Sequence, residues 1–282
     1  MFSYRHGFHA GNHADVLKHV ILVQLLKHLA VKDKPFMVVD THAGAGAYSL
    51  DPGSYAAKNA EFDTGIGRLW GRTDLGGDLA DYLAQIRVFN PGDALRAYPG
   101  SPQIALQMTR AWDPLRLFEL HPTEGRLLAE YFHAAGRRVV VRAEDGFAGL
   151  RSVLPPAARR ALVLIDPSYE DKQDYANLLS ALRDALQRFP TGVYAVWYPQ
   201  VKRRESRELP AQIQRLATGN WLHATLSVTT PPDDGIGLYG SGMFVFNPPW
   251  QLGNGLRTAL PLLKRLLGQD EHAAFELDGR QA

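Results

Sequence analysis

One short segment carries residues suited to chemistry on an amine. The apolar run that starts at Ala161 ends in Asp166, and Pro167, Ser168 and Tyr169 follow it. A carboxylate and a backbone carbonyl that accept both hydrogens of an exocyclic amine would favour the nitrogen geometry that can attack a carbon. Pro167 restrains its own φ and so aims its carbonyl, and the ring of Tyr169 is able to stack on a base. Asp166, Pro167 and Tyr169 are therefore candidate catalytic residues, and an ordinary proline turn is the alternative.

A glycine turn follows a second apolar run. This run, FMVVD, ends in Asp40, and Gly44-Ala45-Gly46 comes shortly afterwards. Glycines let the backbone approach a ligand closely, and ligands of α/β proteins bind at the carboxyl edge of the sheet. Ser49 stands where the dinucleotide fingerprint has its third glycine, so the turn departs from that fingerprint. Gly44 is a candidate ligand-binding residue, and a plain turn is the alternative.

Two further acidic residues follow apolar runs. Glu119 lies near the end of LRLFEL, where a carboxylate can accept both hydroxyls of a ribose. Asp145, followed by Gly146, comes after VVVR, where an acidic side chain can accept an adenine amino group. Acidic residues often cap strand ends for structural reasons alone. Here, however, three successive apolar runs are followed by an acid, because Asp40 ends the first of them. Together they predict a nucleoside pocket without phosphate-binding residues, which favours the cationic S-adenosylmethionine over a nicotinamide dinucleotide.

A sheet must bring these segments together. Five mostly continuous apolar runs occupy residues 36–40, 115–120, 139–142, 161–166 and 193–198. Continuous runs are typical of parallel strands that helices cover on both faces. Helical stretches near 122–136, 145–154 and 172–189 alternate with the runs, and a long helix is predicted over 13–31 behind the N-cap Asn12. The pattern predicts a doubly wound, Rossmann-like α/β sheet.

Two later runs differ from the first five. The runs near 222–229 and 242–247 are joined by a Gly- and Pro-rich link that is too short for a crossover helix, so they should be antiparallel. Asn247-Pro248-Pro249-Trp250 also fits an amine-methylating loop, with Asn247 in place of the acid. Because it follows a strand expected to be antiparallel, it should emerge at the opposite edge of the sheet, and we interpret it as a structural turn.

The connection between the first two runs is longer than a sheet crossover needs. A crossover requires a dozen or so residues, whereas this one extends from residue 44 to residue 114. Residues 74–89 and 102–112 are predicted to be helical. We expect a single domain over residues 1–282 with an inserted helical subdomain at 52–99.

Composition limits the class of protein. The 282 residues are 45% hydrophobic and 21% charged, with a formal net charge of +2, which excludes a disordered chain. Cysteine is absent, which excludes disulfide scaffolds and thiolate chemistry. No apolar run approaches the ~18 residues of a membrane span, and the polar N-terminus lacks the apolar segment of a signal peptide. We therefore expect a cytoplasmic protein without a membrane partner.

Histidines gather near the N-terminus, and six of the ten lie within the first 42 residues. His9 and His13 are four residues apart and could share a metal ion. A catalytic zinc usually takes three protein ligands, however, and no acidic partner is nearby in the sequence. We therefore expect no metal.

The chain resembles the RlmJ family of 23S ribosomal RNA adenine-N6 methyltransferases over nearly its whole length. The most specific matches are residues 3–6 (SYRH), 8–19 (FHAGNHADVLKH), 40–46 (DTHAGAG), 98–102 (YPGSP) and 166–167 (DP). Ser168 departs from the family pattern, which usually has a second proline there, so the loop loses one φ restraint.

The resemblance implies a fold, a cofactor and a partner. The fold is a Rossmann-like class I methyltransferase sheet, mostly parallel with an antiparallel last strand and a helical insertion. S-adenosylmethionine is the expected methyl donor, and 23S ribosomal RNA is the expected partner. Asp166 would be catalytic and Tyr4 would contact the target adenine. The expected contacts of the methyl donor are His19, His42, Gly44, Ser101, Glu119, Asp145, Gly146 and Asp166.

Two questions stay open at this point. The basic stretch that begins with Lys202 and Arg203 follows the fifth run and could neutralise RNA phosphates, or it could simply begin a solvated helix. The catalytic loop suits DNA as well as RNA, so a DNA adenine-N6 methyltransferase is one alternative. A non-catalytic RNA-binding module, suggested by Ser168, is another. Four intact acids argue against it: Asp40, Glu119, Asp145 and Asp166.

Overall fold

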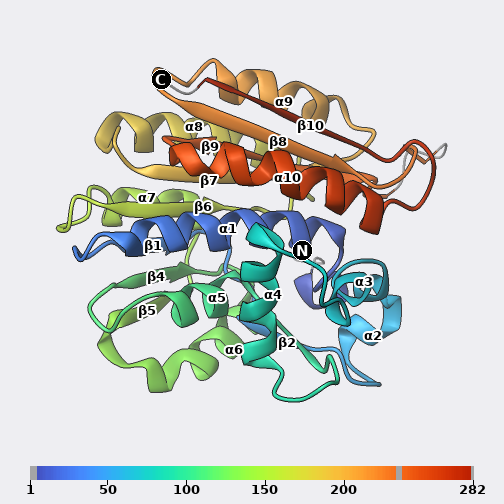
Figure 1. The fold of residues 1–282 in the computed structure, drawn as a ribbon. Helices are drawn as coiled ribbons and strands as arrows, with labels where there is room; N and C mark the ends of the chain where they lie inside the picture. The colour runs from blue at the N-terminus through green and yellow to red at the C-terminus, as the bar shows by residue number, and fades with distance from the viewer. Residues whose placement is uncertain (1–4, 233–236, 281–282) are drawn as a thin grey trace.

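The centre of the molecule is an eight-stranded sheet. The computed structural model describes residues 5–232 and 237–280. The strands of the sheet are β1 (Met37–Asp40), β4 (Leu115–Phe118), β5 (Val139–Arg142), β6 (Ala161–Ile165), β7 (Val193–Gln200), β8 (Trp221–Ser227), β9 (Gly240–Phe246) and β10 (Ala274–Arg280). Their order is β10-β8-β9-β7-β6-β1-β4-β5 (Figure 1), and β2 (Ala47–Ser49) forms a separate antiparallel ribbon with β3 (Ala97–Pro99).

The strand directions confirm the predicted sheet. The pairs β1–β4, β1–β6, β4–β5 and β6–β7 are parallel. Strand β9 runs antiparallel to both β7 and β8, as the short link between the last two apolar runs predicted. The carboxyl ends of the five parallel strands therefore meet along one edge, while β9 ends at the other.

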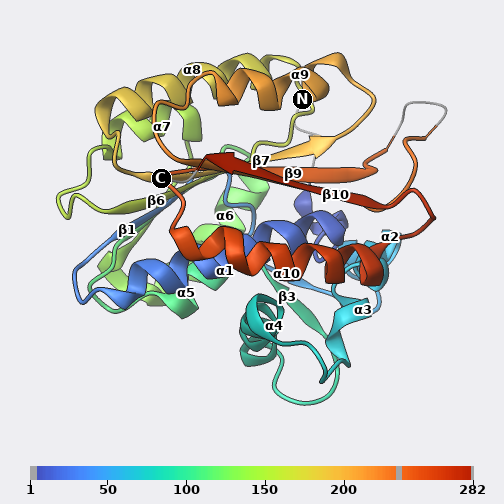
Figure 2. The ribbon, with the colours of Figure 1, turned by 45° about the horizontal axis from the view of Figure 1, so that its top comes forward.

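Helices cover both faces of the sheet. They are α1 (His13–Val31), α2 (Tyr55–Asn59), α3 (Gly67–Trp70), α4 (Gly77–Phe89), α5 (Ser101–Met108), α6 (Pro122–Phe132), α7 (Gly146–Val153), α8 (Gln173–Arg188), α9 (Arg204–Gln214) and α10 (Trp250–Leu267), with 3-10 turns at His6–Phe8, Glu61–Thr64 and His133–Arg138. Figure 2 shows α7, α8 and α9 on one face and α1, α5 and α10 on the other. None of the helices among the described residues is both long and apolar enough to cross a bilayer.

Burial on two faces explains the continuous apolar runs. In β1, Val38 packs into the core under α1, α5 and α10, whereas Met37 and Val39 pack into the core under α7, α8 and α9. Successive side chains of a strand point to opposite faces, so the consecutive residues Met37 to Val39 are all apolar.

Helix α1 begins and ends where its sequence pattern predicted. The side chain of Asn12 accepts hydrogen bonds from the backbone N–H groups of Ala14 (2.9 Å) and Asp15 (3.0 Å), which caps the helix. The helix is buried on almost every side, because the sheet lies on one side of it and α4, α5 and α10 on others. Its charged residues Asp15 and Lys18 are therefore also buried.

Three features differ from the expectations. The helix expected over 102–112 ends at Met108, because the carboxylate of Asp113 accepts bonds from the backbone N–H groups of Arg110 and Phe36 and turns the chain into β4. The C-terminal elements α10 and β10 carried no sequence prediction. Residues 52–99 hold α2, α3 and α4, and α4 shares one hydrophobic core with α1. The boundaries of an inserted subdomain stay a prediction.

Candidate active site

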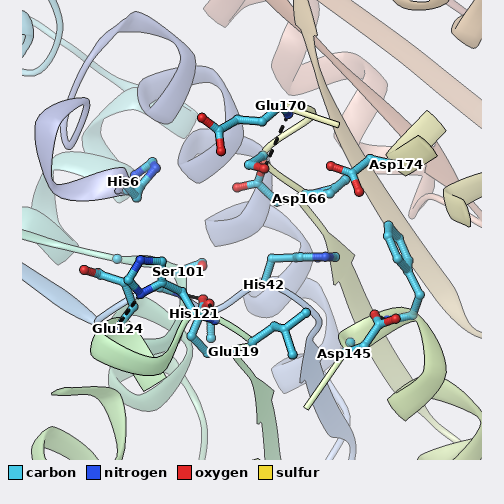
Figure 3. Close-up of a pocket in the computed structure, with 18 of the residues that line it drawn as sticks. His6, His42, Ser101, Glu119, His121, Glu124, Asp145, Asp166, Glu170 and Asp174 are labelled. Atoms are coloured by element: carbon cyan, nitrogen blue, oxygen red, sulfur yellow. Dashed lines mark hydrogen bonds between the residues drawn. The ribbon is translucent and has the colours of Figure 1, made fainter. Parts of the chain in front are cut away.

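A pocket of about 900 Å³ opens at the carboxyl edge of the parallel strands (Figure 3). Three of its walls are the loops after β1, β4 and β6, and the start of α7 forms a fourth. The pocket is lined by nine residues that the sequence singled out: His19, His42, Gly44, Ser101, Glu119, Asp145, Gly146, Asp166 and Pro167. In Figure 3, His42 lies between Asp166 and Glu119, which come from different strands.

Tyr169 is not available to stack on a base, which corrects the sequence expectation. Its side chain is only 3% exposed and packs against Tyr175, with ring centres 4.8 Å apart. Its hydroxyl donates a 2.6 Å hydrogen bond to the carbonyl of Trp197. The backbone of Tyr169 has a φ of 55°, in the left-handed region, and the ring lies in the core under α8 and α9. Tyr169 therefore anchors the loop and does not line the pocket.

None of the three predicted substrate-binding residues is among the residues that line the pocket in the described part of the chain. Lys202 and Arg203 are exposed and do not line the pocket. Arg203 donates from Nη1 to the carbonyl of Tyr169 at 3.0 Å, so it braces the loop that carries Asp166. Tyr4 falls outside the described residues. A phosphate contact from Lys202 or Arg203 stays a prediction.

Glu119 is fixed at the end of β4 by two backbone groups. Its Oε2 accepts from the N–H of Gly44 and its Oε1 from the N–H of His121, each at 2.7 Å. Burial raises the pKa of Glu119, and these N–H groups oppose the rise. Gly44 has a φ of 61°, and a Cβ there would lie 2.2 Å from the hydroxyl of Tyr48. Only glycine fits this turn, which ties the end of β1 to Glu119.

Asp40 does not line the pocket but contacts a residue that does. It is buried, and its Oδ2 accepts a 2.6 Å hydrogen bond from the hydroxyl of Ser101, which itself lines the pocket. Burial raises the pKa of Asp40 to about 6, with a further contribution from the charge of Asp166, and the Ser101 hydrogen bond opposes the rise. Asp40 thus orients Ser101.

The start of α7 forms the fourth wall of the pocket. Oδ1 of Asp145 accepts from the N–H of Phe147 at 2.8 Å and caps the helix. A Cβ on Gly146 would lie 1.9 Å from the carbonyl oxygen of Thr41, so glycine allows α7 to touch the end of β1. The rings of His42 and Phe147 meet edge to face at 4.8 Å. Burial lowers the pKa of His42 to about 3, so this ring is neutral at physiological pH.

His19 lines the pocket, and one of its ring nitrogens is buried without a partner among the described residues. Its Nδ1 lies 2.7 Å from the hydroxyl of Tyr98, which lies 3.0 Å from the hydroxyl of Tyr82. Its Nε2 is buried and has no hydrogen-bond partner within the described part of the chain. Burial lowers the pKa of His19 to about 3. Buried polar atoms are nearly always paired, so the unpaired Nε2 keeps His19 a candidate contact of a ligand in the pocket.

Lys18 is the functional residue that sequence reasoning missed. It is 4% exposed, and its Nζ lies 2.5 Å from Oδ2 of Asp166 and 2.8 Å from Oδ1 of Asp15. Burial lowers the pKa of Lys18, but the two carboxylates outweigh burial and raise it above its usual value. A signal was present: Asp15 and Lys18 stand three apart in the mostly apolar first half of α1, where charges need partners.

The pocket carries an excess of negative charge. Among its lining residues, Lys18 and Lys172 face a larger group of carboxylates, namely Glu119, Glu124, Asp145, Asp166, Glu170, Asp171 and Asp174. Such a lining favours a positively charged ligand over a dinucleotide with its phosphates.

The second segment that fits an amine-methylating loop, at Asn247, lies away from the pocket. Asn247 lies after β9, at the opposite edge of the sheet, and its Nδ2 donates to the carbonyls of Pro190 (2.8 Å) and Gly192 (2.7 Å). This confirms that the Asn247 segment is a structural turn.

His9 pairs with Glu61 at 2.8 Å, and across the described residues no group of three His, Asp or Glu side chains is arranged to hold a metal ion.

Comparisons with known proteins agree on one family. The family model described as ribosomal RNA large subunit methyltransferase D, RlmJ, matches residues 33–277. Proteins called ribosomal RNA large subunit methyltransferase J are 44% identical in Escherichia coli, over 93% of each chain, and 42% identical in Haemophilus influenzae, over 95% of this chain and 94% of that one. A crystal structure of a Legionella pneumophila protein of family DUF519 is similar with a TM-score of 0.87 and 33% identity, and covers 96% of this chain and 98% of that one.

Proposed function

The chain belongs to the RlmJ family of ribosomal RNA large subunit methyltransferases, and on this premise we propose that it methylates N6 of an adenine in 23S ribosomal RNA. One observation carries the proposal: Asp166-Pro167 and the nucleoside-type acids Glu119 and Asp145 line the same pocket. S-adenosylmethionine is the methyl donor, and the reaction takes place in the cytoplasm.

The pocket fits this donor. The two backbone bonds that fix Glu119 leave it able to accept ribose hydroxyls. Asp145, in the loop between β5 and α7, lies where an adenine amino group would be bound, and His19 also lines the pocket. The acidic lining suits a sulfonium. When bound, S-adenosylmethionine supplies an electrophilic methyl group.

The residues of the loop after β6 act on the target amine. The carboxylate of Asp166 and the carbonyl of Pro167 accept the two N6 hydrogens and orient the nitrogen lone pair toward the methyl carbon. Lys18 holds the carboxylate in place through its 2.5 Å contact, and Tyr169 and Arg203 anchor the loop from behind. Rate acceleration then comes mainly from proximity and orientation. The methylated nitrogen carries an extra proton, and Asp166 is the adjacent base that accepts it.

The target base must leave its stack to reach the pocket. Enzymes that act on a base within a helix extrude it or use unpaired substrate. The same loop chemistry would serve DNA, and the family relationship favours RNA.

A methyl-transfer assay tests the proposal. Tritiated S-adenosylmethionine is supplied with deproteinised 23S RNA or with duplex DNA, and the product nucleosides are identified by mass spectrometry. We expect N6-methyladenosine from the RNA and none from the DNA. Transfer to DNA alone, or to another atom of the RNA, would contradict it.

A further inference from the structure

Two aromatic rings and two cations form a cluster on the surface beside the pocket. Tyr55, on α2, is 47% exposed, and the ring of Phe8 lies 5.0 Å from it. Arg5 lies 5.3 Å from the centre of the Tyr55 ring and donates from Nη1 to its hydroxyl at 2.8 Å. Nζ of Lys58 lies 5.1 Å from the Tyr55 ring and 5.8 Å from that of Phe8. We call Arg5, Phe8, Tyr55 and Lys58 the Tyr55 cluster.

The Tyr55 cluster is one residue away from the pocket wall. A Cβ on Gly7 would lie 3.5 Å from Cβ of Tyr55 and 3.7 Å from the ring of Tyr48, so Gly7 separates these two side chains. Tyr48 and His6 both line the pocket, with ring centres 5.2 Å apart. His6 lies at one side of the pocket in Figure 3, and α2 lies beside the start of α1 in Figure 1.

The acid that follows α2 in the sequence does not cancel the charge of the Tyr55 cluster, because other residues bind it. Glu61, which follows α2, is bound by His9 at 2.8 Å and by Nδ2 of Asn12 at 2.9 Å. Arg5 and Lys58 both have aromatic rings as neighbours, and neither forms an ion pair within the described residues. An exposed ring bordered by two cations suits a ligand with a flat face and a negative charge.

We propose that the Tyr55 cluster binds an unpaired nucleotide that flanks the target adenine in the RNA. The base stacks on Tyr55 or on the guanidinium of Arg5, as unstacked RNA bases do on aromatic rings and arginine planes. Lys58 neutralises the adjacent phosphate. The proposal rests on the proposed function, because it takes the substrate to be RNA. Seating a neighbouring nucleotide beside the pocket would help to keep the target base extruded.

The test compares Tyr55→Ala with a matched control, Trp112→Ala. Trp112 is also an exposed aromatic, 56% accessible with Arg110 5.3 Å from its ring, but it lies before β4, at the edge of the sheet away from the pocket. Binding of a single-stranded RNA that contains the target adenine is measured without methyl transfer. We expect Tyr55→Ala to weaken RNA binding by roughly 5- to 150-fold, and Trp112→Ala to leave it unchanged.

Three further readouts separate recognition from a structural role. Tyr55→Phe, which keeps the ring, should restore RNA affinity. Lys58→Ala should lower the slope of log affinity against log salt by about 1. Calorimetry should show unchanged S-adenosylmethionine binding in Tyr55→Ala, and its kcat at saturating RNA should stay near wild type while KM rises.

Two outcomes would overturn the proposal. One is RNA affinity of Tyr55→Ala equal to that of wild type and of Trp112→Ala. The other is equal loss of RNA and S-adenosylmethionine binding, which would mean that the Tyr55 cluster only holds the N-terminal segment in place. Failure of the proposed function is distinguishable, because it would appear as a wild-type protein that forms no N6-methyladenosine.

Discussion

Lys18 and Asp166 are 148 residues apart in the chain, yet Nζ of Lys18 lies 2.5 Å from Oδ2 of Asp166. The lysine comes from a buried helix and the carboxylate from the loop after β6. With Asp15 as its second partner, Lys18 joins the helix that precedes the sheet to the loop that carries the proposed chemistry. The contact positions the carboxylate, so α1 supports the loop that carries Asp166.

Replacing Lys18 should lower both activity and stability. Lys18→Met removes the lysine partner of the buried carboxylate of Asp15 and of the partly buried carboxylate of Asp166. Breaking such a pair should reduce the free energy of unfolding by up to about 3–5 kcal/mol. Denaturant unfolding measures this loss, and the difference from wild type should shrink as the pH falls and the carboxylates become protonated. Lys27→Met is the control. Lys27 lies on α1, like Lys18, but forms an exposed ion pair with Asp81 of α4, so this substitution should lower the free energy of unfolding by under about 1 kcal/mol. Equal losses for the two variants would contradict the prediction.

Asp166→Ala should abolish methyl transfer and leave S-adenosylmethionine binding within a small factor. Its carboxylate is assigned to the amine of the substrate, so it contributes in the transition state and little to ground-state affinity for the donor. Misplacing a reacting group by ~1 Å can cost on the order of 100-fold in rate, and losing the acceptor should cost at least as much. Single-turnover rates and calorimetry test both statements. A folded Asp166→Ala protein that methylates at the wild-type rate would remove Asp166 from the mechanism.

Asp40 should make stability depend on pH. Its pKa is about 6 in the folded protein against 3.8 unfolded, so the folded state holds an extra proton between these values and loses stability as the pH rises through them. Asp40→Asn cannot ionise. Relative to wild type, its free energy of unfolding should therefore rise by up to about 3 kcal/mol between pH 4 and pH 7. A difference that does not change with pH would show that Asp40 does not titrate in this range.

His19 should be neutral, with its proton on Nε2. If Tyr82 donates to Tyr98 and Tyr98 donates to Nδ1 of His19, each hydroxyl hydrogen has an acceptor and the ring proton of His19 lies on Nε2. The opposite arrangement would leave the Tyr82 hydroxyl hydrogen buried without an acceptor, which is costly. Nitrogen-15 NMR of the ring distinguishes the two tautomers. Because burial lowers the pKa of His19 to about 3, the signals should not titrate between pH 5 and pH 8. A proton on Nδ1 would reverse the assignment.

Asn247→Ala should cost stability and leave methyl transfer intact. The amide of Asn247 holds the carbonyls of Pro190 and Gly192 at the edge of the sheet opposite the pocket. Losing these bonds should lower the free energy of unfolding by about 1–3 kcal/mol. Activity of the folded fraction, measured with the same RNA as for Asp166→Ala, should stay near wild type. If Asn247→Ala lost methyl transfer as completely as Asp166→Ala, Asn247 would have to lie at the pocket and not at the opposite edge of the sheet.

The sequence by itself determined the parallel sheet, the bounds of α1 and the loops that form the pocket. These are local properties. A strand covered on both faces is apolar along its length, as in β6, and Asn12 marks the start of its helix wherever the helix is placed. Because the carboxyl ends of parallel strands lie along one edge of the sheet, acids that follow these strands, such as Glu119 and Asp166, lie near one another at that edge.

Only the tertiary structure decided which side chains face the pocket and which partners they have. Tyr169 follows Pro167 by two positions, yet its left-handed φ and the core under α8 and α9 take its ring away from the site. The partner of Lys18 is set by the packing of α1 across the sheet, which no local pattern records. Strand β10 has a charged, mostly exposed sequence, and it is a strand because β8 offers a free edge of backbone donors and acceptors. Contacts of this kind depend on how distant segments pack, and that is why the sequence pattern left them undetermined.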